Sequence, residues 1–210
     1  MPSFPTFLAF GLICLGMVLT PGPNMIYLVS RSICQGSLAG LISLGGVALG
    51  FVVYMLSSAV GITVLLLAVP LAFEALKIAG ALYLGWLAWQ VLKPGGRSPF
   101  QVRDLRKDPP RRLFVMGLVT SLLNPKVAVL YLSLLPQFLD PSRGSVFLQS
   151  IVLGFTQITI SVSVNATIAA MAGRIAIFLA RHLFWIVIQR WLMGTVLAGL
   201  ALRMALEVRR

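Results

Sequence analysis

Residues 36–73 have the sequence GSLAGLISLGGVALGFVVYMLSSAVGITVLLLAVPLAF, which contains no Asp, Glu, Lys, Arg or His. A helix must offer about 20 predominantly apolar residues to cross roughly 30 Å of hydrocarbon, and this stretch is longer than that. Over the whole chain 59% of the residues are hydrophobic and only 10% are charged, whereas about a quarter are charged in a soluble domain. The sequence therefore predicts an integral membrane protein.

Outward from this stretch, the chain divides into six apolar segments. Their approximate ranges are 5–30, 38–60, 72–92, 113–135, 146–172 and 191–208. Helix is expected for each, because a segment that spans a membrane must satisfy its own backbone groups. We therefore expect an all-α integral membrane protein with a single transmembrane domain over residues 1–210. Between the last two segments, basic and aromatic residues mix at 174–190, which suits a helix in the membrane interface.

The basic residues are concentrated in one loop. Residues 93–112 hold seven of the seventeen Lys and Arg against only two acids, Asp104 and Asp108. The positive-inside rule predicts that this loop is cytoplasmic, which puts both termini outside and gives eleven basic residues inside against four outside. A net charge of +12 placed in this way argues against a nucleic-acid partner. No Lys or Arg precedes Arg31, so the basic n-region of a cleaved signal peptide is missing.

Three segments precede the basic loop and three follow it. An odd number of spans makes the second half enter the membrane upside down relative to the first. The sequence therefore predicts two inverted three-helix repeats, residues 1–92 and 113–210, joined by the cytoplasmic loop at 93–112.

Prolines interrupt the first helix of each half. The first break is Thr20-Pro21-Gly22-Pro23-Asn24 and the second is Asn124-Pro125-Lys126. Aligning Pro21 with Pro125 also pairs Tyr27 with Tyr131. A proline frees backbone groups that lipid cannot satisfy. Paired broken helices in corresponding positions of two halves indicate the substrate site of a secondary transporter, so these residues are candidates for substrate binding.

Lys126 lies near the middle of its segment, about 20 Å from the start at 1.5 Å per residue. A charged lysine at that depth costs about 2.5–3.5 kcal/mol on insertion scales, so we expect it to have a role. The hypothesis is recognition of a substrate carboxylate, assisted by the helix N-termini at the breaks. The alternative is a lysine that snorkels or binds carbonyls freed by Pro125. Asn165 is a further candidate for the cavity, with an interhelical hydrogen bond as its alternative.

Other polar and small residues are assigned to packing. The glycines of the second segment are expected to let helices approach closely; they are Gly36, Gly40, Gly46 and Gly50. The two cysteines, Cys14 and Cys34, make no metal-ligand spacing, and the single His182 suits an interfacial position. We expect no metal and no cofactor.

Together these motifs resemble the LysE-type amino-acid exporters, in particular the RhtB-like branch. The resemblance covers about residues 10–140, and it rests on Thr20-Pro21-Gly22-Pro23, the four glycines, Lys77 with Gly80-Ala81-Leu82-Tyr83-Leu84, Asn124-Pro125-Lys126 and Pro136-Gln137-Phe138. It implies a multi-pass protein of the bacterial plasma (inner) membrane that exports amino acids or related small zwitterions. The C-terminal third matches only in its hydrophobic pattern.

The resemblance further implies coupling to the proton gradient. The residues that would carry the coupling are not fixed by the sequence: Glu74 and Asp140 at the outer mouth are candidates, and so is Lys126 itself. The implied partners are a small amino-acid substrate, protons and membrane lipid, and a homo-oligomeric assembly is left open.

Two other classes of function are weighed against export. A membrane-embedded enzyme acting on a lipid or lipid-linked substrate needs an acid, nucleophile or metal set near the membrane, and the sequence offers one histidine and no cluster of carboxylates. A passive channel needs rings of like charge or a filter, and neither pattern occurs. The enzyme remains the main alternative.

Overall fold

The computed structural model describes residues 1–20, 22–68 and 107–181, together with scattered positions at 78–89 and 184–202. All regular structure in this part of the chain is helical. The main helices are α1 (Phe4–Leu19), α2 (Pro23–Gln35), α3 (Ser37–Ala68), α5 (Pro110–Leu122), α6 (Pro125–Val129) and α7 (Val146–Arg181). Helix α6 continues directly into the π-helical η1 (Leu130–Leu134) and the 3-10 helix η2 (Leu135–Phe138), and the short η3 (Pro141–Arg143) precedes α7.

Two helical stretches are long and apolar enough to cross a membrane alone, Ser37–Gly61 and Val146–Ala172. Two more spans arise if each bent pair is one span: α1 and α2 meet at 52°, and α5 meets Pro125–Phe138 at 49°. The described residues thus hold two to four candidate spans. The expected segments 72–92 and 191–208 lie mostly outside them, so the count of six stays a prediction.

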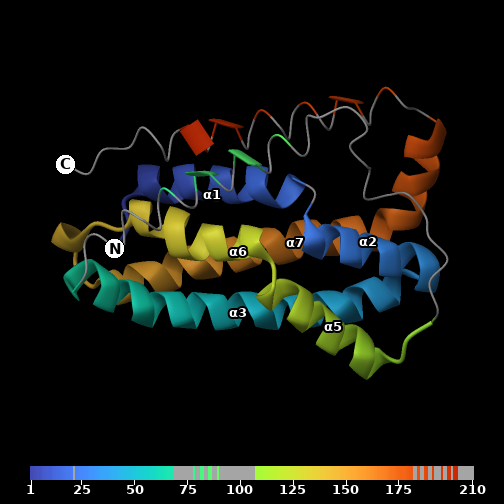
Figure 1. The fold of residues 1–210 in the computed structure, drawn as a ribbon, viewed down its shortest axis with the longest axis horizontal. Helices are drawn as coiled ribbons and strands as arrows, with labels where there is room; N and C mark the ends of the chain where they lie inside the picture. The colour runs from blue at the N-terminus through green and yellow to red at the C-terminus, as the bar shows by residue number, and fades with distance from the viewer. Residues whose placement is uncertain are drawn as a thin grey trace.

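The two bent pairs run in opposite directions along the bundle (Figure 1). Helices α1 and α6 lie toward one end and α2 and α5 toward the other, and α3 and α7 are also antiparallel to each other. Hydrogen bonds join the chain at each end. The amino group of Met1 donates to the Arg143 carbonyl at 2.7 Å, and Gln35 Nε2 donates to the Asp108 carbonyl at 2.6 Å.

Both breaks use a proline in the same way. Helix α2 begins at Pro23 after the N-cap Gly22, and α6 begins at Pro125 after the N-cap Asn124. Proline suits the first helical position, because that residue's N–H has no intrahelical partner. The structure therefore puts Pro23, rather than Pro21, opposite Pro125. The expected pairing of Tyr27 with Tyr131 is wrong by two residues.

Glycines set the spacing between the helices. A Cβ added at Gly46 would overlap the Phe114 carbonyl oxygen of α5, and one added at Gly50 would lie 2.6 Å from the Ser121 Cβ. At Gly40, an added Cβ would overlap the Ser32 hydroxyl of α2. The packing role is confirmed for these three. It is wrong for Gly36, which has a φ of 91° and no neighbour within 4 Å; it allows the chain to turn between α2 and α3.

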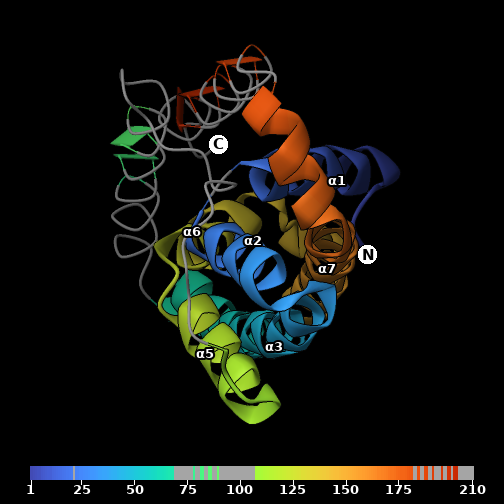
Figure 2. The same ribbon diagram turned by 90° about the vertical axis from the view of Figure 1, so that its right-hand side faces the viewer.

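Seen along the bundle, α2 packs among α3, α5 and α7 (Figure 2). The core beside it draws its largest fully buried side chains from several helices, among them Phe10, Met17, Leu28, Tyr131 and Leu153. Helix α7 continues without interruption to Arg181. Residues 174–181 of the expected interfacial stretch are thus helical and lie beyond the candidate span that ends at Ala172, and their position at a membrane interface stays a prediction.

Candidate functional site

The two helix breaks meet at the side chain of Lys126. Its Nζ donates to the Met17 carbonyl at 2.9 Å and to the Thr20 carbonyl at 2.7 Å. These carbonyls belong to the last turn of α1 and its C-cap, at the negative end of the helix dipole, and the Met17 carbonyl also accepts from the Thr20 N–H at 3.2 Å. Lys126 thus links the second half of the described chain to the break of the first half.

The carbonyls that Lys126 binds are not the ones expected in the alternative raised from the sequence. That alternative supposed carbonyls freed by Pro125, its own neighbour. The stem of Lys126 instead crosses to the other break and lies against Gly22, where an added Cβ would be 3.1 Å from Nζ and 3.2 Å from Cε. The absence of a side chain at Gly22 makes room for the ammonium group.

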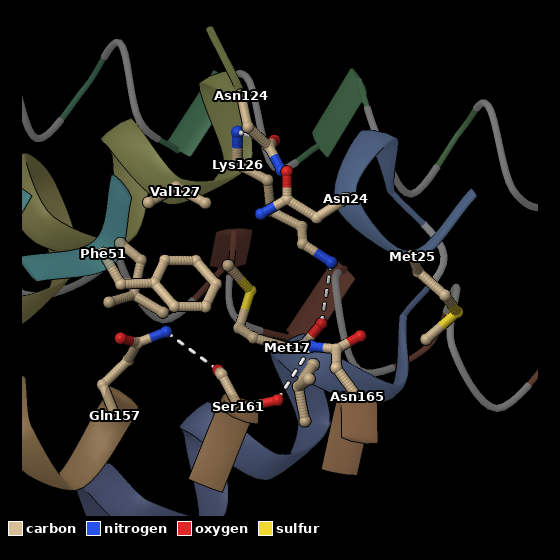
Figure 3. A pocket seen from close by; sticks show the side chains of 12 residues that line it. Met17, Asn24, Met25, Phe51, Asn124, Lys126, Val127, Gln157, Ser161 and Asn165 are labelled. Carbon is tan, nitrogen blue, oxygen red and sulfur yellow. Dashed lines mark hydrogen bonds between the residues drawn. The ribbon is translucent and has the colours of Figure 1, made fainter. Parts of the chain in front are cut away.

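A small cavity of about 30 Å³ adjoins Lys126. Apolar residues of α1, α2, α3 and α6 form part of its wall, among them Met17, Met25, Phe51 and Val127 (Figure 3). Its polar residues are Asn24, Asn124, Lys126, Gln157, Ser161 and Asn165. The volume is room for about one water molecule, far less than the 300 Å³ or more of a typical small-molecule pocket.

Three asparagines gather around the Lys126 side chain (Figure 3). All are buried, with 6% of Asn24, 1% of Asn124 and 4% of Asn165 exposed. The Asn24 Oδ1, Asn124 Nδ2 and Asn165 Oδ1 atoms have no hydrogen-bond partner within the part of the chain that the structure describes. Buried polar atoms without a partner are costly. Two acceptors and one donor therefore stand ready for a polar ligand beside an ammonium group.

The other polar atoms of Asn124 and Asn165 form hydrogen bonds with backbone groups of their own helices. The Asn124 Oδ1 accepts from the Lys126 N–H at 3.0 Å and so caps α6. The Asn165 Nδ2 donates to the Ser161 carbonyl at 2.8 Å within α7. Within the described part of the chain Asn165 forms no hydrogen bond to another helix, so the interhelical alternative is not seen there, and its side chain lines the cavity.

Two polar residues of the cavity wall, Gln157 and Ser161, were not found from the sequence. Gln157 Nε2 donates to Ser161 Oγ at 2.8 Å, and Gln157 Oε1 accepts from the fully buried Tyr131 hydroxyl at 2.5 Å. Gln157, Ser161 and Asn165 recur every four residues along α7, which puts them on one face of the helix. That spacing is the signal that would have found them.

The other candidates for substrate binding lie at the two breaks. The Thr20 side chain is buried and donates to the Gly16 carbonyl at 2.9 Å, so its carbonyl rather than its hydroxyl faces Lys126. Pro23 and Pro125 start the second half of each broken helix. Pro21 lies outside the described residues.

The acid candidates for coupling lie apart from this cavity. Asp140 caps η3 with a half-exposed side chain: Ser142 donates to its Oδ1 from the hydroxyl at 2.6 Å and from the backbone at 2.9 Å. These hydrogen bonds from Ser142 hold the pKa of the Asp140 carboxyl below its usual value. Glu74 lies outside the described residues, as does Lys77.

A buried ion pair joins α2 to the start of α5, and sequence reasoning did not find it. Arg31 Nη1 lies 2.6 Å from Asp108 Oδ2, with 10% and 8% of the two side chains exposed. Arg112 lies 3.0 Å from the other carboxylate oxygen. The Arg31 guanidinium also sits over the Tyr27 ring, 5.7 Å from its centroid. Arg31 and Asp108 are 77 positions apart in the chain, and the sequence pattern gave no reason to pair them.

Comparison with known proteins decides the class of this molecule. The family model described as LysE type translocator matches residues 15–208. The chain belongs to the LysE family of translocators. The predicted family is thereby confirmed, and this LysE-family chain is a transporter rather than a membrane-embedded enzyme. Among the described residues no group of three His, Cys, Asp or Glu is arranged to hold a metal ion.

Named relatives cover most of this LysE-family chain. It is 33% identical to a homoserine/homoserine lactone efflux protein of Salmonella typhimurium strain LT2, over 83% of this chain and 84% of the relative. It is 25% identical to a leucine efflux protein of Klebsiella pneumoniae, over 90% of this chain and 89% of the relative. An uncharacterized membrane protein of Pseudomonas aeruginosa is 35% identical over 65% of each chain. No solved structure matches it significantly.

Proposed function

We propose that this protein exports amino acids or related small zwitterions across the bacterial plasma membrane. The observation that carries the proposal is the contact of Lys126 with the first helix break, beside a cavity that holds three unsatisfied asparagine atoms. The relatives are named for efflux of homoserine, homoserine lactone and leucine. Homoserine and leucine are zwitterions, whereas the lactone carries an amino group without a carboxylate, so the proposal for this chain rests on the two amino acids.

Lys126 is the proposed partner of the substrate carboxylate. It is the described cation nearest to the cavity, and a buried ammonium binds a carboxylate strongly once water is excluded. The Asn124 Nδ2, buried and without a partner in the described part of the chain, can donate a second bond to the same carboxylate. The N-terminal turn of α2 lies at the same break and contributes favourable partial charge.

The proposed architecture is the one predicted from the sequence: six spans in one domain, with residues 1–92 and 113–210 as inverted repeats. The opposite directions of the α1–α2 and α5–α6 pairs support it, as do the antiparallel α3 and α7 (Figure 1). In this arrangement the loop at 93–112 is cytoplasmic and both termini are outside, which the bias of basic residues supports.

Coupling to the proton gradient is part of the proposal. Of the two acids singled out at the outer mouth, Asp140 is held ionised by its bonds from Ser142. A group that stays ionised near neutral pH exchanges no proton there, which argues against Asp140 and leaves Glu74 as the other candidate acid. Lys126 is the alternative within the cavity itself.

The proposal is tested by counterflow in proteoliposomes with a panel of labelled amino acids that includes homoserine and leucine, with and without a pH gradient. Lys126→Met keeps an apolar stem and removes the charge, so we expect export to fall tenfold or more. Folding should persist, since the insertion cost of about 2.5–3.5 kcal/mol disappears. Lys107→Met is the matched control, because that lysine is exposed in the basic loop.

Normal export by the Lys126→Met variant would remove Lys126 from the site. Absence of counterflow for every amino acid in the panel, with protein that is folded and inserted, would refute amino-acid export. A rate that ignores the pH gradient would leave export standing and remove proton coupling.

A further inference from the structure

The ammonium group of Lys126 lies between backbone carbonyls that would accept hydrogen bonds from any ammonium group. Two carbonyl oxygens at the end of α1, those of Met17 and Thr20, accept from it at 2.9 and 2.7 Å. A lysine ammonium has three N–H donors and no acceptor, and so has the α-ammonium of an amino acid. The two groups are interchangeable at such a pair of oxygens.

We propose that the Met17 and Thr20 carbonyls are the subsite for the substrate's ammonium group, and that Lys126 fills it as a tethered substitute while no substrate is bound. This inference rests on the proposed export of amino acids. An entering zwitterion gives its ammonium to the two carbonyls and its carboxylate to the displaced lysine. Lys126 thus changes partner when the substrate binds.

The size of the cavity favours such a displacement. The space of about 30 Å³ beside Lys126 is much smaller than a typical small-molecule pocket of 300 Å³ or more, so binding of an amino acid calls for a rearrangement that the lysine head can supply. Gly22 has no side chain to block the ammonium, and an added Cβ there would lie 3.1 Å from Nζ. Movement of the lysine head past Gly22 frees both the carbonyl pair and the volume of the lysine's terminal atoms.

The asparagine oxygens complete the subsite. Two carbonyls satisfy two of the three N–H donors of an ammonium, and the third needs another acceptor. Asn24 Oδ1 and Asn165 Oδ1 line the same cavity, are more than nine-tenths buried and have no partner among the described residues. Either oxygen can accept the third bond from a substrate held at the carbonyl pair.

Charge balance then selects zwitterions. A plain amine that takes the carbonyl pair leaves the Lys126 ammonium buried without a counter-group, and an unpaired buried charge is strongly unfavourable. An amino acid avoids this penalty because its carboxylate receives the displaced lysine. The wild-type protein should therefore bind leucine and reject 3-methylbutylammonium, which is leucine without its carboxyl group.

The test measures the thermal stability of purified protein in detergent with leucine, 3-methylbutylammonium or N-acetylleucine. We expect leucine alone to stabilise the wild type and the Lys107→Met control. In Lys126→Met the carbonyl pair has lost its ammonium and the flexible thioether chain can turn aside as the lysine does, so we expect 3-methylbutylammonium to bind at least tenfold more tightly than to wild type. N-acetylleucine, which lacks the ammonium, should stabilise none of the three proteins.

A second variant keeps the test decisive if Lys126→Met is unstable. Lys126→Ala removes the three terminal carbons and the nitrogen, which together are propylammonium. We expect added propylammonium to restore the melting temperature of this variant, and propyltrimethylammonium, which has no N–H donor, to fail. If both cations restored the melting temperature equally, the site would bind cations without N–H donation to the Met17 and Thr20 carbonyls, and the inference would be overturned.

The remaining outcomes separate this inference from the proposed function. If wild type binds leucine and 3-methylbutylammonium equally, or if neither Lys126 variant gains affinity for its amine, the tethered-substitute idea is wrong while export stands. If the wild type neither binds nor moves leucine or homoserine, and the variants still gain their amines, the ammonium subsite stands and amino-acid export fails.

Discussion

The contact between α3 and α5 gives a sharp prediction for Gly46. A Cβ added there would overlap the Phe114 carbonyl oxygen and lie 2.8 Å from the Leu118 nitrogen, where ordinary contact begins at 3.4 Å. These neighbours are backbone atoms in a helix, so they cannot rotate away as a side chain can. Gly46→Ala therefore forces the two helices apart by more than half an ångström.

The expected cost is at the upper end of the range for overpacked cores, about 3 kcal/mol. For a chain of this size that corresponds to a fall in melting temperature of roughly 6–12 °C. The assay is thermal unfolding of purified protein in detergent, followed by the loss of monodisperse material. Gly45→Ala is the matched control, because an added Cβ there meets only the edge of the Phe114 ring, at 3.4 Å.

Both substitutions gain the same helix propensity, so the difference between them isolates the helix contact. Equal melting temperatures for the two variants would refute the close approach of α3 and α5 at this point.

Three further predictions concern single residues. Asp108→Asn removes a buried carboxylate 2.6 Å from Arg31 and should destabilise the protein by about 3 kcal/mol; an unchanged melting temperature would contradict this. Gly22→Ala crowds the flexible end of Lys126, so export in proteoliposomes should fall several-fold with little loss of stability, and full activity would argue against a role for that end. Asp140 has a lowered pKa and protonates only in acid, so Asp140→Asn should leave the dependence of export on a pH gradient unchanged; loss of that dependence would identify Asp140 as a coupling residue.

Composition and local pattern were enough for several conclusions. The uncharged stretch at 36–73 predicts membrane helices, since a helix satisfies its own backbone groups in lipid and a continuous apolar run of this length is enough to span the hydrocarbon. The breaks at Pro23 and Pro125 were visible because proline removes a donor wherever it stands. Lys126 was conspicuous because its charge is expensive at that depth. Each of these arguments uses only residues that are neighbours in the chain.

Contacts between distant residues needed the tertiary structure. One alternative raised from the sequence had Lys126 binding carbonyls freed by Pro125, whereas it binds those of Met17 and Thr20, more than a hundred residues earlier. The buried pair of Arg31 and Asp108 was hidden for the same reason. The alignment of the two breaks was also misplaced from the sequence. The first break contains two prolines, and only the helix geometry identifies Pro23 as the one that begins α2.

The sequence by itself determined that this chain is a helical membrane protein with two broken helices and one costly lysine. Only the tertiary structure decided which groups that lysine meets, because the direction of a side chain after a bend depends on how the two half-helices pack. The bends of 52° and 49° and the opposite directions of the two pairs bring the breaks together. The hydrophobic pattern predicts which segments lie in the membrane, and the packing between those segments determines which polar atoms face each other.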